Sequence, residues 1–329
     1  MACEHSFARY IRKLGHNRKF SNSLTQEEAR AAMAAIACYE VEPQQVGAFL
    51  MLLRLKQKTP EEIAGFAEAI RENLPKPVDL PAVAVDWPAY AGKSKQSPWF
   101  LLAALLLGQN GYPVFMHGLS RRDEKVYIPQ ALRVLGIESC TLLSQAAARV
   151  GKEGFAYLPV DNLSGIVQEL IDYRKQLGVR TPMHTVARML NPLSASLMLQ
   201  GVRHPPYARM HQGAARLLKQ EKNLAILGDS GEFERIPGRP CKLYGLSNGL
   251  CWEEEWPVEE GFGTDVPQNL DLEHFKAVWE GRQEDEYGKS AVIGTVALVL
   301  RGLGQATERE KAYQLAEQWW LMRNTNTAA

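Results

Sequence analysis

The sequence predicts an α/β protein with a separate small all-helical N-terminal domain. Three observations indicate this class. The first 74 residues contain helix signals throughout, a proline-rich break follows them, and short β-like runs then alternate with helical ones. The break is Leu74–Pro77, in which two prolines flank a lysine. We therefore expect a helical domain over residues 1–77 and an α/β domain over residues 78–329.

Three helix starts are recognisable in the N-terminal domain. Thr25 followed by Glu28 has the pattern of a capping box, and a run without Gly or Pro comes after it. A second start lies at Glu42-Pro43, after which apolar residues recur at helical spacing. The third start, at Thr59-Pro60, combines an N-cap residue, a proline in the first turn and two following acids that suit the helix dipole.

The α/β domain is predicted from apolar runs of alternating type. Runs typical of strands are Ala82–Val85, Pro113–Met116, Phe155–Val160 and Leu224–Leu227. Runs typical of helices are Trp99–Leu107, Ile128–Leu135 and Arg209–Glu221. Such alternation favours a sheet flanked by helices.

The charges are distributed unevenly along the chain. The formal net charge of the 329 residues is +1, but residues 1–250 carry 31 Lys/Arg against 22 Asp/Glu, and residues 251–329 carry 7 against 15. The acids gather in residues 251–286, which hold 12 of them. The asymmetry indicates either a basic partner surface on the body of the protein or a scatter of charge without function.

Composition excludes several classes of protein. The longest apolar runs, Trp99–Leu107 and Ala291–Leu300, are much shorter than the roughly 20 residues of a membrane-spanning helix. The first 20 residues contain no apolar core of a secretory signal. The five cysteines are odd in number, widely spaced and never in a C-x-x-C pair, which argues against disulfides and a zinc site. We expect a cytoplasmic protein that does not associate with membranes.

Six segments, in order, resemble the anthranilate phosphoribosyltransferases. They are Leu24–Ala29, Phe49–Lys56, Thr59–Gly65, Tyr173–Thr181, Leu190–Pro192 and Gly201–Pro205. The resemblance implies the nucleoside phosphorylase/phosphoribosyltransferase architecture. In it, a segment near residues 162–190 completes the helical domain, and two chains form a homodimer through that domain.

The substrate motifs of that family are largely lost. Its glycine-rich pyrophosphate loop aligns with Ala89–Lys93, in which Gly92 alone is retained and Lys93 stands where the family has an aspartate. In its second motif only His117 and Gly118 match, and two arginines follow shortly afterwards.

The remaining positions of the family's site are also altered. Arg174 matches the arginine that would hold the carboxylate of anthranilate, and could equally be an ordinary helix-surface residue. The magnesium pair of the family is replaced by Glu232 and Glu234, which Phe233 separates. We therefore expect no metal and no cofactor, with magnesium on these two glutamates as the alternative, and assign no catalytic residue.

Scaffold residues persist while substrate contacts are lost, a pattern that resembles the divergent, YbiB-like branch of the family. That branch implies sequence-nonspecific binding of nucleic acid, single-stranded DNA or RNA, by a homodimer. Phosphate backbones are bound by clusters of Lys and Arg. The candidate contacts are Arg9, Arg12, Lys13, Arg18, Lys19, Lys93, Lys95, Arg121, Arg122, Arg174 and Lys175.

Two questions remain open at this point. Trp87, Tyr90 and Trp99 lie near the bases and could stack nucleobases or belong to the core. The alternative function is that of a phosphoribosyltransferase, acting on phosphoribosyl pyrophosphate with magnesium and an acceptor that is anthranilate or another compound.

Overall fold

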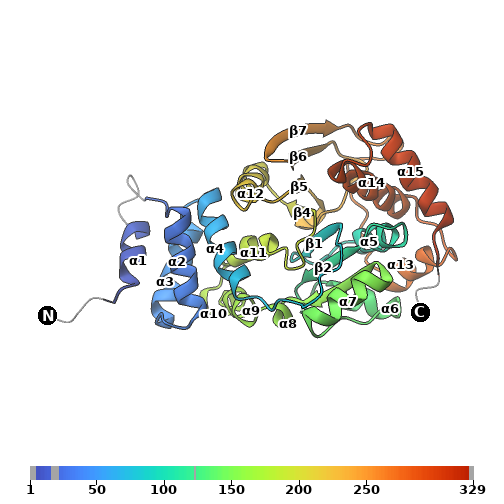
Figure 1. The fold of residues 1–329 in the computed structure, drawn as a ribbon. Helices are drawn as coiled ribbons and strands as arrows, with labels where there is room; N and C mark the ends of the chain where they lie inside the picture. The colour runs from blue at the N-terminus through green and yellow to red at the C-terminus, as the bar shows by residue number, and fades with distance from the viewer. Residues whose placement is uncertain (1–4, 16–21, 122–123, 326–329) are drawn as a thin grey trace.

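The computed structural model describes residues 5–15, 22–121 and 124–325. Four helices form the N-terminal bundle, at the left of Figure 1, and an α/β domain follows. The bundle consists of α1 (Ala8–Gly15), α2 (Gln26–Ala37), α3 (Pro43–Leu55) and α4 (Pro60–Glu72). The predicted fold class is confirmed.

Two of the predicted helix starts form capping boxes. The hydroxyl of Thr25 accepts a hydrogen bond from the backbone N–H of Glu28, and that of Thr59 accepts from the N–H of Glu62. Glu62 does more than cap its helix. Its buried carboxylate also accepts from the backbone N–H of Leu24 at 2.9 Å and from Lys56 Nζ at 2.8 Å. The turn between α3 and α4 is therefore anchored to the start of α2.

The α/β domain is built on one mixed seven-stranded sheet of order β3-β2-β1-β4-β5-β6-β7. The first five strands are parallel, and β6 and β7 are added as antiparallel neighbours at one edge. The strands are β1 (Val85–Ala89), β2 (Val114–Gly118), β3 (Phe155–Pro159), β4 (Leu197–Val202), β5 (Lys222–Leu227), β6 (Cys241–Ser247) and β7 (Leu250–Trp256).

β1 begins later in the chain than the strand that the sequence predicts. Residues 82–84 precede β1, because parallel pairing begins only at Val85, which faces Val114 on one side and Leu197 on the other. The predicted strand over Ala82–Val85 was therefore displaced by three residues. The hairpin of β6 and β7 was not predicted.

Helices cover both faces of the sheet. One face of the sheet shares a hydrophobic core with α5 (Trp99–Gln109), α6 (Ile128–Val134), α13 (Leu272–Trp279), α14 (Glu286–Leu303) and α15 (Arg309–Met322). The other packs with α7 (Leu143–Glu153), α8 (Val160–Leu163) and α12 (Pro205–Leu217). The hydrophobic core of the second face continues into the helical bundle, so the bundle and sheet share one buried surface.

A later helical segment connects the bundle to the sheet. It comprises α9 (Gly165–Asp172), α10 (Arg174–Leu177), α11 (Met183–Val186) and the 3-10 helix η1 (Ala187–Met189). α11 lies beside α4 in Figure 1, and both α11 and η1 contact that helix. The guanidinium of Arg71 on α4 donates to the carbonyl oxygen of Met189 at 2.7 Å. Within the part of the chain that the structure describes, no helix is long and apolar enough to span a membrane.

Candidate anion-binding cleft

A cleft of about 410 Å³ opens where the parallel strands end. Its walls come from the loops after β1, β4 and β5, from α11, η1 and the start of α12, and from the end of α3 with the turn that follows. Ligand sites of parallel α/β sheets form at the carboxyl ends of the strands. The cleft lies at that edge and receives side chains from both the bundle and the sheet domain.

The charged residues lining the cleft are basic. Five cationic side chains line it, and no carboxylate does so among the described residues. The five are Arg54, Lys58, Arg180, Arg188 and Arg203. Cations held close together in a partly dry site repel one another and are relieved by an anion. The arrangement therefore favours a negatively charged ligand.

This concentration of positive charge, together with burial, lowers the pKa values of titratable groups in the cleft. Burial and the neighbouring Arg54 lower the pKa of Lys58 to about 8. Burial and nearby cations, Arg188 foremost, lower the pKa of both His184 and His211 to about 3. The two imidazoles are therefore neutral at pH 7, and neither reaches the protonated state needed for acid catalysis near that pH.

Arg188 is the most deeply placed cation and is only 8% exposed. Its guanidinium donates to the carbonyl oxygen of His184 at 2.7 Å and to that of Gly231 at 3.3 Å, which joins α11 to the loop after β5. Its Nε has no hydrogen-bond partner among the described residues. A buried guanidinium with an unused donor is costly unless a ligand or water completes its hydrogen bonding.

The basic surface continues out of the cleft. After burial, the positive charges of Arg174 and Arg203, and more weakly Arg121, lower the pKa of Arg180, so these side chains lie near one another. Arg121 is partly compensated, since it donates to Asp172 at 2.9 Å, and Lys175 lies 3.3 Å from the same carboxylate. The sequence-predicted residues Arg121, Arg174 and Lys175 thus border the cleft or the helix beside it.

The prediction that Lys93 contacts phosphate is wrong, because the side chain is buried. We expected it on a surface that binds phosphate, but it is 1% exposed. Its Nζ lies 2.5 Å from Asp229 Oδ2 and 2.5 Å from Glu234 Oε1. Burial alone would lower the pKa of Lys93, yet the two carboxylates outweigh it and raise that pKa. Lys93 is the internal counter-ion of this pair and does not reach a ligand in the cleft. Lys95, two residues later, is exposed.

The same cluster shows that a magnesium ion does not fit the residues as they stand. Glu234 is occupied by Lys93 and by the backbone N–H of Phe100, which donates to it at 2.8 Å. Glu232 accepts from the N–H groups of Ala91 at 2.6 Å and Gly92 at 2.8 Å. The described residues contain no group of three or more His, Cys, Asp or Glu able to hold a metal. The ammonium of Lys93 neutralises Glu234, one of the two carboxylates that a metal would require.

The retained motif residues have structural roles. Gly92 adopts φ +68°, and a side chain there would meet the ring of Tyr127. A Cβ on Gly118 would lie 2.0 Å from the carbonyl oxygen of Ala89 on the neighbouring strand. His117 is fully buried, with Nδ1 at 2.8 Å from the Tyr90 hydroxyl. These contacts account for the three residues without a ligand.

Burial decides between the two roles considered for the aromatic residues. Trp87, Tyr90 and Trp99 are at most 2% exposed, so they belong to the core and do not stack nucleobases. The aromatic ring that does line the cleft is that of Tyr207, over which Lys58 Nζ lies at 5.2 Å from the ring centroid.

The N-terminal basic cluster lies apart from the cleft. Arg9, Arg12 and Lys13 are on α1, at the outer edge of the bundle in Figure 1, whereas the cleft adjoins α11 and α12. Lys13 pairs with Glu28 at 2.5 Å and Arg9 donates to the hydroxyl of Tyr10. Arg18, Lys19 and Arg122 are outside the described residues. The structure therefore does not join this cluster to the cleft within one chain.

The contacts predicted from the sequence include none of the five cations that line the cleft. Arg54 and Lys58 belong to a run of three bases in five residues just before the third helix start, and this run was the available signal. Arg203 follows β4 directly, and appeared in the sequence only as part of a family match. What brings the three together is the contact between the bundle and the sheet, which no local pattern reports.

The acidic section does not line the cleft, but Asp265 lines a neighbouring hollow to which Arg203 and Ser230 of the cleft also contribute. None of the residues 251–286, all of which the structure describes, lines the cleft itself. Glu253 and Glu254 lie on the edge strand β7, where Glu253 pairs with Arg209 at 3.0 Å and Glu254 pairs with Arg301 at 2.8 Å. The negative charges of Glu253 and Glu254 are thus partly neutralised locally, at the edge of the sheet.

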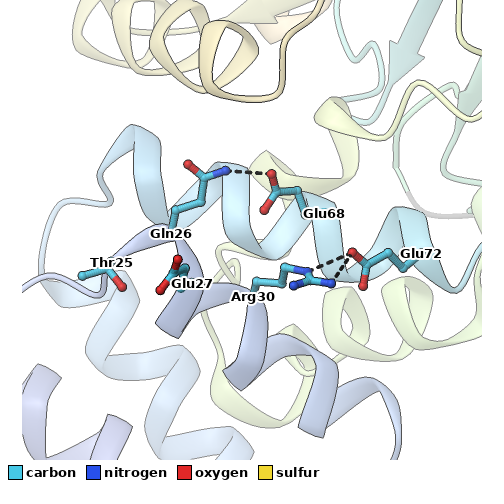
Figure 2. A pocket seen from close by; sticks show the side chains of 6 residues that line it. All are labelled: Thr25, Gln26, Glu27, Arg30, Glu68 and Glu72. Carbon is cyan, nitrogen blue, oxygen red and sulfur yellow. Dashed lines mark hydrogen bonds and ion pairs between the residues drawn. The ribbon is translucent and has the colours of Figure 1, made fainter.

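A second hollow on the surface has the opposite character. Figure 2 shows it between α2 and α4, where three glutamates accompany a single arginine. Gln26 donates to Glu68 at 2.7 Å and Arg30 donates to Glu72 at 2.8 Å. One arginine does not balance three carboxylates, so the lining stays negative and disfavours anions.

Comparison with known proteins agrees with the fold. The family described as "Glycosyl transferase family, helical bundle domain" matches residues 8–74. An anthranilate phosphoribosyltransferase structure from Thermus thermophilus has a TM-score of 0.79 at 20% identity, covering 96% of this chain and 94% of that one. One from Saccharomyces cerevisiae in complex with PRPP and Mg has a TM-score of 0.78 at 16% identity, covering 97% and 94%. The chain is thus similar in sequence to anthranilate phosphoribosyltransferases and shares their fold, and its helical bundle matches that of a glycosyl transferase family.

Two relatives show the extent of the sequence similarity. The chain is 29% identical over 275 residues to the uncharacterized protein YbiB of Escherichia coli (strain K12), covering 81% of this chain and 84% of the relative. It is 27% identical over 304 residues to the anthranilate phosphoribosyltransferase of Methylocella silvestris, covering 89% and 86%. The expected resemblance to the family is confirmed.

Proposed function

We propose that this protein binds nucleic acid without sequence specificity, as single-stranded DNA or RNA. The observation that carries the proposal is the cleft lined by five cationic side chains and, among the described residues, no carboxylate. Nonspecific affinity for nucleic acid comes from Lys and Arg contacts to phosphates and the counterions they release. The exposed cations at the cleft's rim, Arg54 and Arg203, are in position to make such contacts.

The surroundings of the cleft support a binding path for a strand. Arg174 and Lys175 are exposed on α10, and Lys95 is exposed beside the loop that contributes Ala91. Tyr207 offers the half-buried ring on which a base can stack, a contact that is tolerant of sequence. We expect little sequence preference, because the proposed contacts are to phosphates, which carry no sequence information.

The alternative, a phosphoribosyltransferase, is less well supported. It requires magnesium on Glu232 and Glu234, and those carboxylates are engaged by backbone N–H groups and by Lys93. Calorimetry with phosphoribosyl pyrophosphate and magnesium separates the two functions. Tight binding that depends on magnesium would favour the enzyme, whereas we expect none.

Fluorescence anisotropy with a labelled oligonucleotide tests the proposal. Binding is measured at about 50 mM and about 200 mM salt, since each phosphate contact steepens the salt dependence. We expect Arg54→Glu and Arg203→Glu to weaken binding and flatten its salt dependence. A protein without affinity for any single strand at low salt would overturn the proposal.

Arg216→Glu is the matched control. Arg216 is exposed near the end of α12, the helix whose start lines the cleft, about 18 Å along the axis from His204 by the rise of an α-helix. It makes the same change of charge as Arg203→Glu, at an exposed position on the helix that follows the Arg203 loop. We expect it to alter binding far less than Arg203→Glu, and equal losses would place the contact surface outside the cleft.

We also propose that the protein acts as a homodimer formed through the helical bundle. A twofold pair presents every basic group twice, which lengthens the surface available to a strand. Light scattering coupled to size-exclusion chromatography measures the mass directly, and a monomer at working concentrations would contradict this arrangement.

A further inference from the structure

We propose that the cleft takes a phosphate monoester, the phosphorylated end of a strand, in preference to an internal phosphodiester. The inference rests on the proposed function and concerns the same site. It follows from how the cleft changes with depth, from how its charge is concentrated, and from its size. The floor is formed by buried polar residues and the rim by exposed basic ones.

The lining residues range from exposed to buried, and we infer from this that the cleft has an outer rim and an inner end. At the rim, Arg54 and Arg203 are exposed. At the floor, Arg188 is 8% exposed and His211 is 2% exposed. An internal segment of a strand must enter and leave, so both of its ends have to pass the rim. A terminus enters once and can reach the floor with one phosphate, which suits a pocket closed at its inner end.

The size of the pocket agrees with one terminal nucleotide. Its volume of about 410 Å³ lies in the range of about 300–1,000 Å³ typical of small-molecule sites. A pocket of this size has room for a mononucleotide and not for an extended run of strand. The ring of Tyr207 and the neutral imidazole of His184 line the same space and can contact a base or sugar.

The charge favours a monoester over a diester. A phosphate monoester carries about −1.5 to −2 charges at pH 7 and three acceptor oxygens, whereas an internal diester carries one charge. Five cations surround the pocket, and the Nε of the deepest, Arg188, has no partner among the described residues. Both the excess positive charge and the unused donor are better satisfied by the more highly charged group.

Lys58 supplies a measurable signature of binding. It faces Arg54 on α3, Lys56 in the same turn, Glu62 on α4 and His211 on α12. Its pKa of about 8 arises from burial and the nearby Arg54. A dianion in the pocket stabilises the ammonium and raises that pKa, so binding at pH 8 takes up a fraction of a proton, about half at most. Calorimetry in buffers of different ionisation enthalpy measures this uptake.

The experiment compares four ligands, of which the three strands have the same base sequence. They are a 5′-phosphorylated strand, a 3′-phosphorylated strand, the same strand with hydroxyls at both ends, and a free nucleoside monophosphate. We expect one phosphorylated strand to bind at least about tenfold more tightly than the hydroxyl-ended strand, the factor that one charge-assisted hydrogen bond supplies. We also expect it to take up more protons at pH 8.

Variants assign the preference to the pocket. Lys58→Met removes a half-buried ammonium whose contact is with the ring of Tyr207. It should bring the ratio of phosphorylated to hydroxyl-ended affinity close to one and abolish the extra proton uptake. Arg188→Gln tests the floor, and its circular dichroism and melting temperature report whether it folds. Arg216→Glu should leave the ratio unchanged.

The outcomes separate this inference from the proposed function. Equal affinity and equal proton uptake for phosphorylated and hydroxyl-ended strands would overturn the inference and leave nucleic-acid binding in place. Binding of the free monophosphate without binding of any strand would overturn the proposed function, and would support a phosphate-monoester pocket for a small ligand. Absence of binding by all four would overturn both.

Discussion

Replacing Lys93 with methionine tests the buried cluster behind the cleft. The substitution keeps an unbranched apolar stem of similar length and removes only the charge. In the wild-type protein this ammonium lies 2.5 Å from both Asp229 and Glu234 and is 1% exposed. Without it, two carboxylates face each other in the interior with no cation between them.

The magnitude follows from that geometry. Removing one partner of a buried ion pair costs about 3–5 kcal/mol, because the remaining charge stays desolvated. We expect Lys93→Met to lower the free energy of unfolding by about 4 kcal/mol at about pH 8, where both carboxylates are charged in the wild-type protein. Domains of ordinary stability have about 5–15 kcal/mol in total, so the variant should fold but be marginal.

The loss should depend on pH in a defined direction. Burial raises the pKa of Glu234 to about 7 in the wild-type protein, against 4.5 for the ordinary carboxyl, even with Lys93 opposing the shift. Between pH 4.5 and 7 the folded protein keeps this proton on Glu234, whereas the unfolded chain releases it. The folded state therefore loses stability as the pH rises from 4.5 to 7. In Lys93→Met the pKa of Glu234 moves higher. Protonation at about pH 6 then removes one of the two charges, and the cost should fall to about 2 kcal/mol.

Urea denaturation followed by tryptophan fluorescence at about pH 6 and about pH 8 measures both values. Lys95→Met is the matched control, since Lys95 is exposed two residues away and should cost less than about 0.5 kcal/mol. Lys93→Met combined with Glu234→Gln should recover part of the stability, because the amide oxygen can still accept from Phe100 N–H. A loss below about 1 kcal/mol that is the same at both pH values would refute the buried ion pair.

Three further predictions follow from the same structure. Arg203→Ala should reduce the slope of log affinity against log salt by about 0.7–0.9, the contribution of one phosphate contact, and an unchanged slope in anisotropy titrations would exclude it as a contact. Burial holds the pKa of His211 at about 3, so the unfolded chain takes up a proton below pH 6.5 that the folded imidazole refuses. Stability should therefore fall by about 2 kcal/mol at about pH 5, and His211→Gln should reduce this acid-induced loss in denaturation experiments. Gly118→Ala, which places Cβ 2.0 Å from the Ala89 carbonyl oxygen, should lower the melting temperature whether or not ligand is present, and a neutral result would remove the packing explanation for that glycine.

The order of elements was largely predictable from sequence. Helix starts at Thr25 and Thr59 depend on hydrogen bonds between residues three apart, and such local rules act before any tertiary contact forms. The buried helix α5 was predictable from its continuous apolar run. The start of β1 was misplaced because strand pairing with distant segments decides it. The β6–β7 hairpin was missed, although a turn with Asn248 and Gly249 joins its strands.

The candidate site was only partly predictable. The sequence by itself determined the resemblance to anthranilate phosphoribosyltransferases, the loss of their substrate motifs and the basic excess before residue 250, since each is a property of residue order alone. It could not decide which bases face solvent. Lys93 and Lys95 are two residues apart, yet one is an internal counter-ion and the other is exposed. Pairing with Asp229 and Glu234, over 130 residues away in the chain, makes that difference.

The cleft itself is a property of the tertiary structure. Arg54 comes from the bundle, Arg188 from the connecting segment and Arg203 from the end of a sheet strand. Each alone has the sequence context of an ordinary surface arginine. These cations are brought close enough to repel one another, and some of them are buried, only when the hydrophobic core joins the bundle to the sheet. The charge and the depth of the cleft therefore come from that packing.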